Sequence, residues 1–600
     1  MANPVAAQTT EGSPLFHRYF GLLVAILLLA MVAVQFAVMR GDSQANDESF
    51  HLLTGYRFLK TGSLTLSCEH PPLAQLIAAA PLLALDLRLP GPHLEAGDEA
   101  QAAKEREFLY ANRYPAETIL LWARSAALLW VLLLGGLIAW WTRRHFGPVA
   151  ALAALLVLAC DPAFLAHGHY TDNDVPVAFC LLAAVLSWNA FLKGGRMSSA
   201  ALCGVMTGVA MSTKYSSLLL FPMYVLLYGA SWWRQSGGFR HSLWHLTKSM
   251  TVLVGTMFLV VFVIFRFEFR PLMPMELMEN PEPISVKILK RPDVLGGLTA
   301  SVLKHPERLR LLDTLVQHTP IPAASFFRGL FLVTKHGSGG HPTYLLGQYS
   351  LRGWWYYFPV VIAVKTPVGI LLLFLLAAIL AARALLRDGW RAAIGKLKRC
   401  SPDWYALTIP PLFYFAISVE THINIGIRHL LPMYPFLFIW VAAVVFSLSQ
   451  GSVGNWGRRV AAVCIALGIA ETALAFPTYL GFFNILSGGS RMGMNYVVDS
   501  NLDWGQDMKR LKTYLTQHHV ERPCVSSFGI GTPDDYGIRW QPVPGTLAEA
   551  QAAGCVVVMS NTQFVFDGAD QRSYQWLHGL TPTDLVGTSF RVYRLPASRP

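Results

Sequence analysis

Acidic and histidine side chains are concentrated in a stretch that follows the first apolar segment of the chain. This stretch contains the adjacent pair Asp47 and Glu48, then His51, then Glu69 and His70. Partial removal from water and nearby carboxylates raise the pKa of a carboxyl group, whereas nearby cations lower it. A general base needs such tuning. The stretch is therefore a candidate catalytic loop, and a solvated acidic pair beside a membrane span is the simpler alternative.

A second polar stretch offers a different chemistry. It contains Asp172 and Asp174, two residues apart, shortly after His167 and His169. Carboxylates and imidazoles at this spacing could bind a divalent metal ion. They could equally orient a sugar hydroxyl or cap the helix that we expect from Val175 onward. A divalent metal is the less favoured of these alternatives, and no cofactor is expected.

Basic side chains also occur where membrane proteins rarely place them. Lys214, Lys365, Arg428 and His429 lie at the expected outer ends of apolar segments. Charged side chains at membrane depth are costly and usually have a function. A lipid phosphate at the headgroup level would be a natural partner for them. The alternative is that their side chains simply extend to the membrane surface.

The composition indicates what holds these residues in place. The chain has 600 residues, of which 53% are hydrophobic and 14% are charged, and its mean hydropathy is +0.40. Soluble domains usually carry about 25% charged residues. A membrane-spanning helix needs about 20 mostly apolar residues. This length predicts about eleven spans, near residues 20–39, 118–141, 147–163, 173–192, 198–213, 215–232, 248–267, 356–382, 404–420, 429–449 and 459–477.

The basic residues between these segments indicate the orientation. The net charge is +12, but Lys and Arg lie mostly in short alternate loops, and no basic soluble module is present, so nucleic-acid binding is not expected. By the positive-inside rule these loops and the N-terminus are cytoplasmic. An odd number of spans then places the tail outside an inner (plasma) membrane. The outer loops include 41–117 and 268–355, and most of the polar residues described above lie in outer loops.

The tail has a different pattern from the rest of the chain. Helices are expected at 505–517 and 547–553, and strands at 524–529 and 555–560. This pattern indicates a small α/β domain. Outside the cytoplasm a disulfide between Cys524 and Cys555 is permitted. We therefore divide the chain into a transmembrane module, residues 1–477, and an extracytoplasmic domain, residues 478–600.

Five motifs occur in order along the chain. They are Glu69-His70-Pro71-Pro72-Leu73, Gly340-His341-Pro342-Thr343-Tyr344-Leu345-Leu346-Gly347, Lys365-Thr366-Pro367, Asn424-Ile425-Gly426-Ile427-Arg428-His429-Leu430-Leu431-Pro432 and Asp499-Ser500-Asn501-Leu502-Asp503-Trp504-Gly505-Gln506-Asp507. With the acidic pair, they resemble glycosyltransferase family 39, a family of the GT-C membrane glycosyltransferases. The family includes protein O-mannosyltransferases and is related to aminoarabinose transferases. The bacterial members that use a phospholipid carrier are the most similar.

The resemblance implies an inverting glycosyltransferase with a GT-C helical fold. Such an enzyme moves a sugar from a polyprenyl-phosphate or dolichyl-phosphate carrier to an acceptor glycan, lipid or protein outside the cytoplasm. Asp47 then matches the catalytic residue of the acidic pair and Glu48 its partner. The donor phosphate would contact Lys214, Lys365, Arg428 and His429. The substrate-binding residues would be His51, Glu69, His70, Asp172, Asp174, His341 and Tyr344.

Two features leave alternatives open. Gln75 stands where the family often has lysine after the His-Pro-Pro motif, which removes one candidate phosphate contact. A membrane transporter or lipid flippase is the alternative function. Transporters place ionisable residues near the middle of the bilayer. Here Arg124 is the main charge within a predicted span, and the other charges gather at one side, so the sequence favours an enzyme at the membrane surface.

Overall fold

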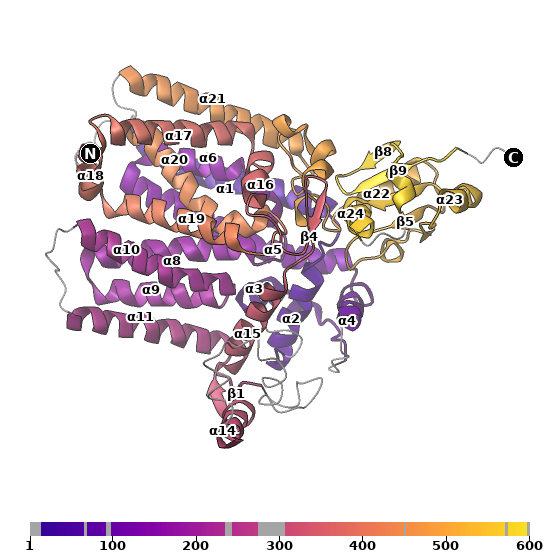
Figure 1. Ribbon diagram of the computed structural model, residues 1–600, viewed down its shortest axis with the longest axis horizontal. Coiled ribbons are helices and arrows are strands. Elements are labelled where there is room, and N and C mark those ends of the chain that lie inside the picture. The colour runs from indigo at the N-terminus through magenta and orange to yellow at the C-terminus, as the bar shows by residue number, and fades with distance from the viewer. Residues whose placement is uncertain are drawn as a thin grey trace.

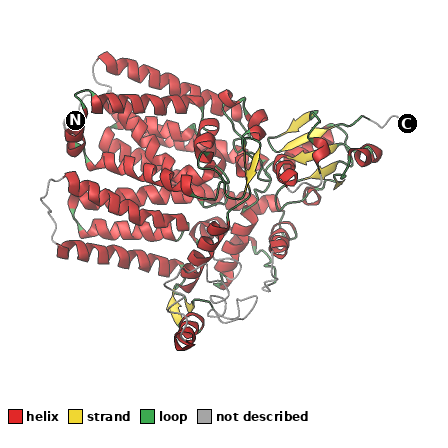
Figure 2. Ribbon diagram, in the orientation of Figure 1, coloured by secondary structure: helices red, strands yellow, loops and turns green. Residues whose placement is uncertain are grey.

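The computed structural model describes residues 14–64, 69–91, 98–234, 243–273, 306–448, 452–569 and 574–596. Long helices lie side by side in a bundle, and a small domain with a β-sheet lies at one end of it (Figure 1). Among the described residues the largest sheet belongs to that domain, and two short strand pairs lie outside it (Figure 2). The structure therefore confirms a helical membrane module with a small α/β domain at its C-terminal end.

Apolar helices form the bundle. They are α1 (Pro14–Gly41), α5 (Ala116–Phe146), α6 (Pro148–Ala159), α8 (Asp174–Gly194), α9 (Met197–Met211), α10 (Leu220–Arg234), α11 (Leu243–Ile264), α17 (Val368–Leu386), α19 (Pro402–Glu420), α20 (Tyr434–Leu448) and α21 (Ser452–Ala475). Among the described residues, six helical segments are long and apolar enough to cross a membrane: 18–41, 116–146, 174–194, 244–264, 368–386 and 427–446. The chain is thus a multi-pass membrane protein, and the total of about eleven spans stays a prediction.

Two predicted spans are interrupted. The segment predicted at 356–382 is divided into α16 (Tyr357–Lys365) and α17, with Thr366 in an extended conformation between them. Pro367 is the reason, because a residue that precedes proline is disfavoured in the helical conformation. The segment predicted at 429–449 begins with a tight 3-10 turn, η6 (Ile427–Met433), before α20. These interruptions place Lys365 and Arg428 at helix ends.

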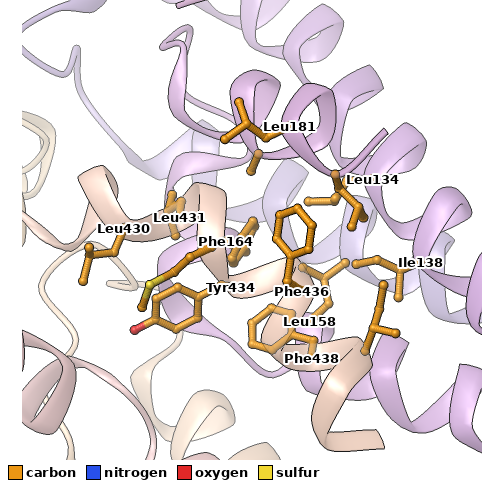
Figure 3. Close-up of a cluster of buried hydrophobic side chains, with 14 of the residues drawn as sticks. Leu134, Ile138, Leu158, Phe164, Leu181, Leu430, Leu431, Tyr434, Phe436 and Phe438 are labelled. Carbon is orange, nitrogen blue, oxygen red and sulfur yellow. The ribbon is translucent and has the colours of Figure 1, made fainter. Parts of the chain in front are cut away.

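Aromatic and aliphatic side chains of α5, α6, α7 (Pro162–His167) and α20 fill the centre of the bundle. The ring of Phe164 lies edge-on to Phe438, with centroids 5.7 Å apart, and to Tyr434, at 6.5 Å. Leu158 and Phe436 lie beside these rings (Figure 3). Edge-to-face aromatic pairs stabilise a core beyond the area that they bury. This cluster supports the turn that carries Arg428, because η6 leads directly into α20.

The described part of residues 41–117, the first predicted outer loop, folds onto the end of the bundle. Its helices are α2 (Glu48–Thr61), α3 (Leu73–Ala79), η2 (Ala80–Leu85) and α4 (Asp98–Tyr110). The apolar run from Leu73 to Leu85 buries Ala78, Leu82 and Leu85 in a cluster with Leu53 on α2. Residues 268–355 were predicted to form a second outer loop. Their described part forms the strand pair β1 (Phe269–Pro271) and β2 (Pro320–Pro322), helices α14 (Pro306–Gln317) and α15 (Ala324–Gly339), and the hairpin of β3 (Thr343–Leu345) and β4 (Gln348–Ser350).

The tail contains a mixed five-stranded sheet with the strand order β6-β5-β7-β9-β8. Its strands are β5 (Cys524–Ser526), β6 (Gln541–Pro542), β7 (Val557–Ser560), β8 (Asp584–Val586) and β9 (Phe590–Tyr593), and its helices are α22 (Met508–Gln517), α23 (Leu547–Ala553) and α24 (Asn561–Ala569). The expected helices and strands are all present. Strands β5 and β7 are parallel neighbours, and a disulfide joins Cys524 to Cys555 with the Cα atoms 5.8 Å apart.

Residues from several of the predicted basic loops lie together at one end of the bundle. At the end away from the sheet, Lys193 Nζ lies 3.0 Å from Asp403, His145 Nε2 lies 4.0 Å from the same carboxylate, and the basic helix α18 (Trp390–Arg399) lies nearby (Figure 1). At the other end Asp42, directly after α1, pairs with Arg510 of the tail at 2.8 Å. The basic loops that were predicted to share one side of the membrane thus meet at one end of the fold.

Candidate active site

A cavity of about 350 Å³ lies between the bundle and the tail domain. The bundle and its outer loops contribute Asn46, Asp47, His341, Pro342, Tyr349, Ile425 and Arg428, and the tail contributes Asp499, Trp504, Phe528 and Phe566. Such a mixture of aromatic walls and a few converging polar groups is typical of a ligand site. The cavity brings together the acidic stretch and parts of three quoted motifs, Gly340–Gly347 with the predicted site residue His341, Asn424–Pro432 and Asp499–Asp507.

Arg428 is the centre of an ion-pair network at this cavity. Its Nη1 atom lies 2.9 Å from Asp47 Oδ2 and 3.9 Å from Asp174 Oδ2. Asp174 also pairs with Lys214. The guanidinium carbon of Arg428 lies 4.4 Å from the ring centroid of Trp504, which is a cation–π contact. Two carboxylates and two cations therefore share one polar site.

The backbone of the acidic loop is held by the last of the five motifs. The Ser43 N–H donates to the carbonyl of Gln506, and the Asn46 N–H donates to the carbonyl of Trp504, both at 2.8 Å. Asp47 follows directly, as the residue before α2, and the Oδ1 of its side chain accepts a 3.2 Å hydrogen bond from the Asn46 amide. The Asp499–Asp507 motif therefore positions Asp47 through backbone hydrogen bonds, and not through contacts of the motif's side chains.

The turn that carries Arg428 also depends on the tail. The Ile427 N–H donates to Asn501 Oδ1 at 3.0 Å. Gly426 has a φ of 151°, and a side chain there would begin 2.6 Å from Ser500 Oγ. Glycine is needed at this position because its φ is positive and the Ser500 side chain approaches it so closely. His429 follows Arg428 within electrostatic range of Lys214 and Asp174.

Arg428 also sets the protonation of Asp47. Burial raises the pKa of the Asp47 carboxyl group, but the Arg428 guanidinium and, more weakly, His51 oppose this, and the net pKa lies below its usual range. Asp47 is therefore an ionised carboxylate at neutral pH. About a third of its side chain is exposed (32%), so it is open to the cavity.

Glu48 makes different contacts from its neighbour. Its carboxylate accepts two hydrogen bonds from Arg124, at 2.9 and 2.6 Å, and both side chains are only 1% exposed. Arg124 also donates to the carbonyls of Met39, Asp42 and Ser43. Glu48 thus ties α2 to α5 below the cavity and does not line it. These contacts favour a structural role for Glu48, and the catalytic partnership with Asp47 that the sequence indicated stays a prediction.

A buried histidine, His51, and a half-buried one, His70, lie beside the acidic loop. Gln75 Nε2 lies 3.0 Å from His51 Nδ1, and because the amide nitrogen can only donate, His51 carries its proton on Nε2. The rings of His51 and His70 are 5.1 Å apart. Burial lowers the pKa of His51 to about 4 and that of His70 to about 3, with mutual repulsion adding to the latter. Both are neutral at pH 7, and Gln75, in the place of the expected lysine, bonds a histidine.

Some predicted site residues lie away from the cavity lining. Lys365 is buried, and its Nζ donates to the carbonyls of Leu480 and Asn501 at 2.7 and 2.5 Å, which is the environment of a structural cation. Tyr344 lies on β3 and packs against the bundle core, whereas Tyr349 across the hairpin lines the cavity. Glu69 lies next to His70 and is likewise outside the lining residues.

The second polar stretch forms a compact group beneath Arg428. His167, Asp172 and Asp174 each offer a ligand atom, and these atoms lie within 4.8 Å of one another. However, His167 Nδ1 already bonds Asp172 at 2.9 Å, and Asp174 is paired with Lys214. Protein cations therefore balance the charge of Asp174. This arrangement favours an ion-pairing role for Asp174 over metal ligation, and Asp172 accepts from the Asp174 N–H at the start of α8 at 3.0 Å. The metal and sugar-hydroxyl alternatives stay predictions.

Sequence reasoning did not assign roles to the residues that the tail brings to the cavity. Asp499 and Trp504 belong to the Asp499–Asp507 motif, so the sequence did mark this segment. The spacing within the motif does not indicate which of its three aspartates faces the cavity. Asp503 and Asp507 are fully buried and bonded within the tail. Phe528 and Phe566 have no sequence signal, because isolated aromatics are common in any folded core.

Comparison with known proteins gives one family and several solved structures. Residues 120–265, from α5 to the end of α11, match the family model described as dolichyl-phosphate-mannose-protein mannosyltransferase. A comparison with curated proteins finds no match. The matched segment is about a quarter of the chain, and it includes Asp174 and Lys214 of the ion-pair network.

Three solved structures are similar to this chain. ArnT from Cupriavidus metallidurans, bound to undecaprenyl phosphate, is 13% identical, with 96% of this chain and 99% of that chain covered and a TM-score of 0.43. The Pmt1-Pmt2 protein O-mannosyltransferase complex of S. cerevisiae, bound to the sugar donor, is 12% identical, with 79% and 91% covered and a TM-score of 0.48. The oligosaccharyltransferase AglB from Archaeoglobus fulgidus, in complex with an inhibitory peptide and a dolichol-phosphate, is 15% identical, with 76% and 56% covered and a TM-score of 0.40.

At these identities and TM-scores the likenesses determine neither a substrate nor an acceptor for this chain. The family model is a match of sequence and carries more weight. It shows that residues 120–265 of this chain are similar to that mannosyltransferase family, and the five motifs lie outside this segment.

Proposed function

We propose that this protein is an inverting glycosyltransferase that moves a sugar from a polyprenyl-phosphate carrier to an acceptor at the extracytoplasmic surface of the membrane. The observation that carries the proposal is the network of Arg428, Lys214, Asp47 and Asp174 beside a cavity at one end of a membrane bundle. A hexose as the transferred sugar is a finer expectation, which rests on the resemblance alone.

The two cations suit the leaving group of this reaction. Breaking the bond between the anomeric carbon and the phosphate oxygen leaves a lipid phosphate anion. Arg428 and Lys214 are held in place before the reaction by Asp47 and Asp174, so little reorganisation is needed when negative charge develops nearby. The carrier's hydrocarbon tail stays in the bilayer between spans, and its headgroup meets these cations at the bundle end.

The carboxylates suit the attacking group. An acceptor hydroxyl attacks the anomeric carbon from the face opposite the phosphate, and a carboxylate of the cavity takes its proton. A single displacement of this kind inverts the anomeric configuration. Asp47, which the sequence assigned to proton transfer, is one such carboxylate, and its contact with Arg428 links the attacking side of the site to the leaving side.

The tail domain suits an acceptor-binding role. It closes one wall of the cavity with Trp504, Phe528 and Phe566. Aromatic faces stack well on sugar rings, and a glycan, a glycolipid or a protein side chain would approach from this side. The tail is proposed to be extracytoplasmic and the N-terminus cytoplasmic. The disulfide between Cys524 and Cys555 supports this orientation, because disulfides persist in oxidising compartments.

A transporter or lipid flippase receives less support. Transport needs ionisable groups near the middle of the bilayer that change partners. Arg124, the charge that the sequence placed within a span, is buried with five hydrogen bonds to Glu48 and to backbone carbonyls. A guanidinium that is fully bonded in this way is part of the fold rather than a carrier of substrate.

The test is an assay of carrier release by purified protein supplied with polyprenyl-phosphate-linked sugars and candidate acceptors. We expect wild-type protein to release carrier, and we expect Arg428→Gln to reduce release by about 10²-fold or more, since it removes a charge from the leaving-group side. Arg88→Gln is the matched control, because Arg88 is an exposed arginine in the first outer loop.

The outcome that contradicts the proposal is carrier release by Arg428→Gln at the rate of Arg88→Gln. An epitope tag at the C-terminus, detected with an antibody, separately tests which side of the membrane the tail domain faces. Accessibility of the tag in right-side-out vesicles is expected, and accessibility only after permeabilisation would place the tail, and with it the reaction, on the wrong side.

A further inference from the structure

Two carboxylates from different parts of the chain face the same cavity. Asp47 enters from the bundle side, directly before α2, and Asp499 enters from the tail, in the short turn η9 (Asp499–Asn501). Both lie close enough to Arg428 to interact with its charge. A transfer reaction needs only one proton acceptor, so the second carboxylate is free to serve another function.

The backbone of Asp499 is held in an uncommon conformation. Its φ is +59°, in the left-handed region that residues other than glycine seldom adopt. The Asp499 N–H donates to Thr562 Oγ1 at 3.1 Å, and the Asp499 carbonyl accepts from the N–H groups of Leu502 and Asp503 at 2.8 and 2.9 Å. Such strain persists only where the surroundings enforce it, and it clusters at functional sites. Here it turns the side chain of Asp499 toward the cavity.

The two carboxylates differ in how fully they are engaged. Asp47 accepts from Arg428 on Oδ2 and from Asn46 on Oδ1. Asp499 accepts from the N–H of Ser500 on Oδ1, and its Oδ2 accepts no hydrogen bond from the residues that the structure describes. Oδ2 is therefore the oxygen that is available to an incoming hydroxyl. It lies on the tail side of the cavity, where the acceptor is proposed to bind.

The charges around the two carboxylates also favour Asp499 as the proton acceptor. Burial raises the pKa of Asp499, and the charge of Asp47 adds slightly to this rise. Arg428, the hydrogen bond from the Ser500 N–H and His341 oppose the rise without cancelling it. The pKa of Asp47 is lowered, chiefly because Arg428 outweighs its burial. A carboxylate with a higher pKa is the stronger base, and an efficient general base has a pKa closer to the working pH.

We propose that Asp499 is the general base that takes the proton of the acceptor hydroxyl, and that Asp47 holds Arg428 in place for the leaving phosphate. This assignment rests on the transferase activity proposed above. As the acceptor O–H bond breaks, its proton passes to Asp499 Oδ2 and its oxygen bonds the anomeric carbon. The bond from that carbon to the phosphate oxygen breaks, and the electron pair leaves with the polyprenyl phosphate. Asp499 then returns the proton to solvent.

The test compares Asp499→Asn and Asp47→Asn in steady-state transfer assays across pH, with Asp584→Asn as the matched control. Asparagine tolerates the left-handed conformation, and Asp499→Gly, which accepts positive φ without strain, provides a second variant should Asp499→Asn misfold. Asp584 is an exposed aspartate of the same domain. We expect Asp499→Asn to lower kcat about 10²- to 10⁴-fold with the donor KM changed less than about twofold, and Asp47→Asn to raise the donor KM because Arg428 loses its partner.

The pH profile separates the two carboxylates. The general base is active when ionised, so kcat/KM of the wild type falls as pH drops through the pKa of the base. We expect this fall in kcat/KM above the usual aspartate range in the wild type. We expect it to persist in Asp47→Asn at a somewhat lower pH, because the charge of Asp47 no longer raises the pKa of Asp499, and to be absent from Asp499→Asn and Asp499→Gly.

Three outcomes overturn the assignment. Transfer by the Asp499 variants at the rate of Asp584→Asn would show that Asp499 is not the base, and so would a fall in kcat/KM that disappears only in Asp47→Asn. Wild-type protein that releases no carrier would remove the proposed function itself and this assignment with it. The first two outcomes leave the transferase function intact.

Discussion

Replacement of Glu48 by glutamine tests whether the second member of the acidic pair acts in structure or in chemistry. Both oxygens of Glu48 bond Arg124, and Glu48 Oε2 also accepts from the Ala45 N–H at 2.8 Å. Oε1 lies 3.3 Å from the N–H of Thr171. Glutamine keeps the shape of the side chain, but it removes the negative charge and turns an N–H₂ group toward a guanidinium or a backbone N–H.

The expected loss of folding stability in Glu48→Gln follows from the burial of the Glu48–Arg124 ion pair. Both side chains are 1% exposed, so solvent cannot replace the lost charge of Glu48. Removing one partner of a buried ion pair costs about 3–5 kcal/mol, because the other charge stays buried without compensation. Each 1.4 kcal/mol is a tenfold change in an equilibrium constant. The ratio of folded to unfolded protein should therefore fall roughly 10²- to 10⁴-fold.

The assay is thermal unfolding of the detergent-purified protein, followed by transfer activity per folded molecule. We expect a clear drop in Tm for Glu48→Gln, with activity per folded molecule largely kept. Glu117→Gln is the control, because Glu117 forms an exposed pair with Lys509 at 3.3 Å, and surface pairs contribute about 0–1 kcal/mol. A Glu48→Gln protein with the wild-type Tm and no transfer would refute this reasoning and return Glu48 to the catalytic role.

Two further predictions concern residues whose roles the structure specifies. Replacing Cys524 and Cys555 by serine removes a disulfide that spans a sequence separation of 31 residues. The chain-entropy treatment predicts that this destabilises the tail domain by about 3–4 kcal/mol. Limited proteolysis of the tail measures the loss of stability, and unchanged resistance to the protease would contradict the prediction. Lys365→Met leaves the carbonyls of Leu480 and Asn501 without their hydrogen-bond donor. Each buried carbonyl left unpaired costs about 1–3 kcal/mol of folding stability. It should lower Tm and leave the donor KM of the folded protein unchanged, whereas a raised KM at normal Tm would restore Lys365 as a phosphate ligand.

The helices could be located from the sequence because length and apolarity are local properties. The apolar segments predicted near 118–141 and 173–192 are α5 and α8, and residues 547–553 of the tail form α23 within the predicted bounds. The broken segment at 356–382 is the instructive exception. Its apolar run is continuous except around Lys365 and Pro367, and proline acts on the conformation of the preceding residue, which an average over a window of residues does not register.

The sequence also narrowed the location of the site. Charge bias between the apolar segments placed Asp47, Asp174, Lys214 and Arg428 on one side of the membrane, and the structure brings these four into one network. This prediction was possible because alternation between spans fixes which loops share a side. It did not depend on any knowledge of the contacts between the loops.

Which side chains meet was decided only by the tertiary structure. Asp47 and Arg428 are 381 positions apart, and no local rule relates them. Successive residues at the start of a helix point about 100° apart, so Asp47 faces the cavity while Glu48 turns inward to Arg124. The pairing of Lys365 with backbone carbonyls has a similar origin, because a buried charge takes whichever partners the packed chain provides. The sequence thus determined the kinds of residue and the end of the bundle at which they gather, and long-range packing determined which of them can react.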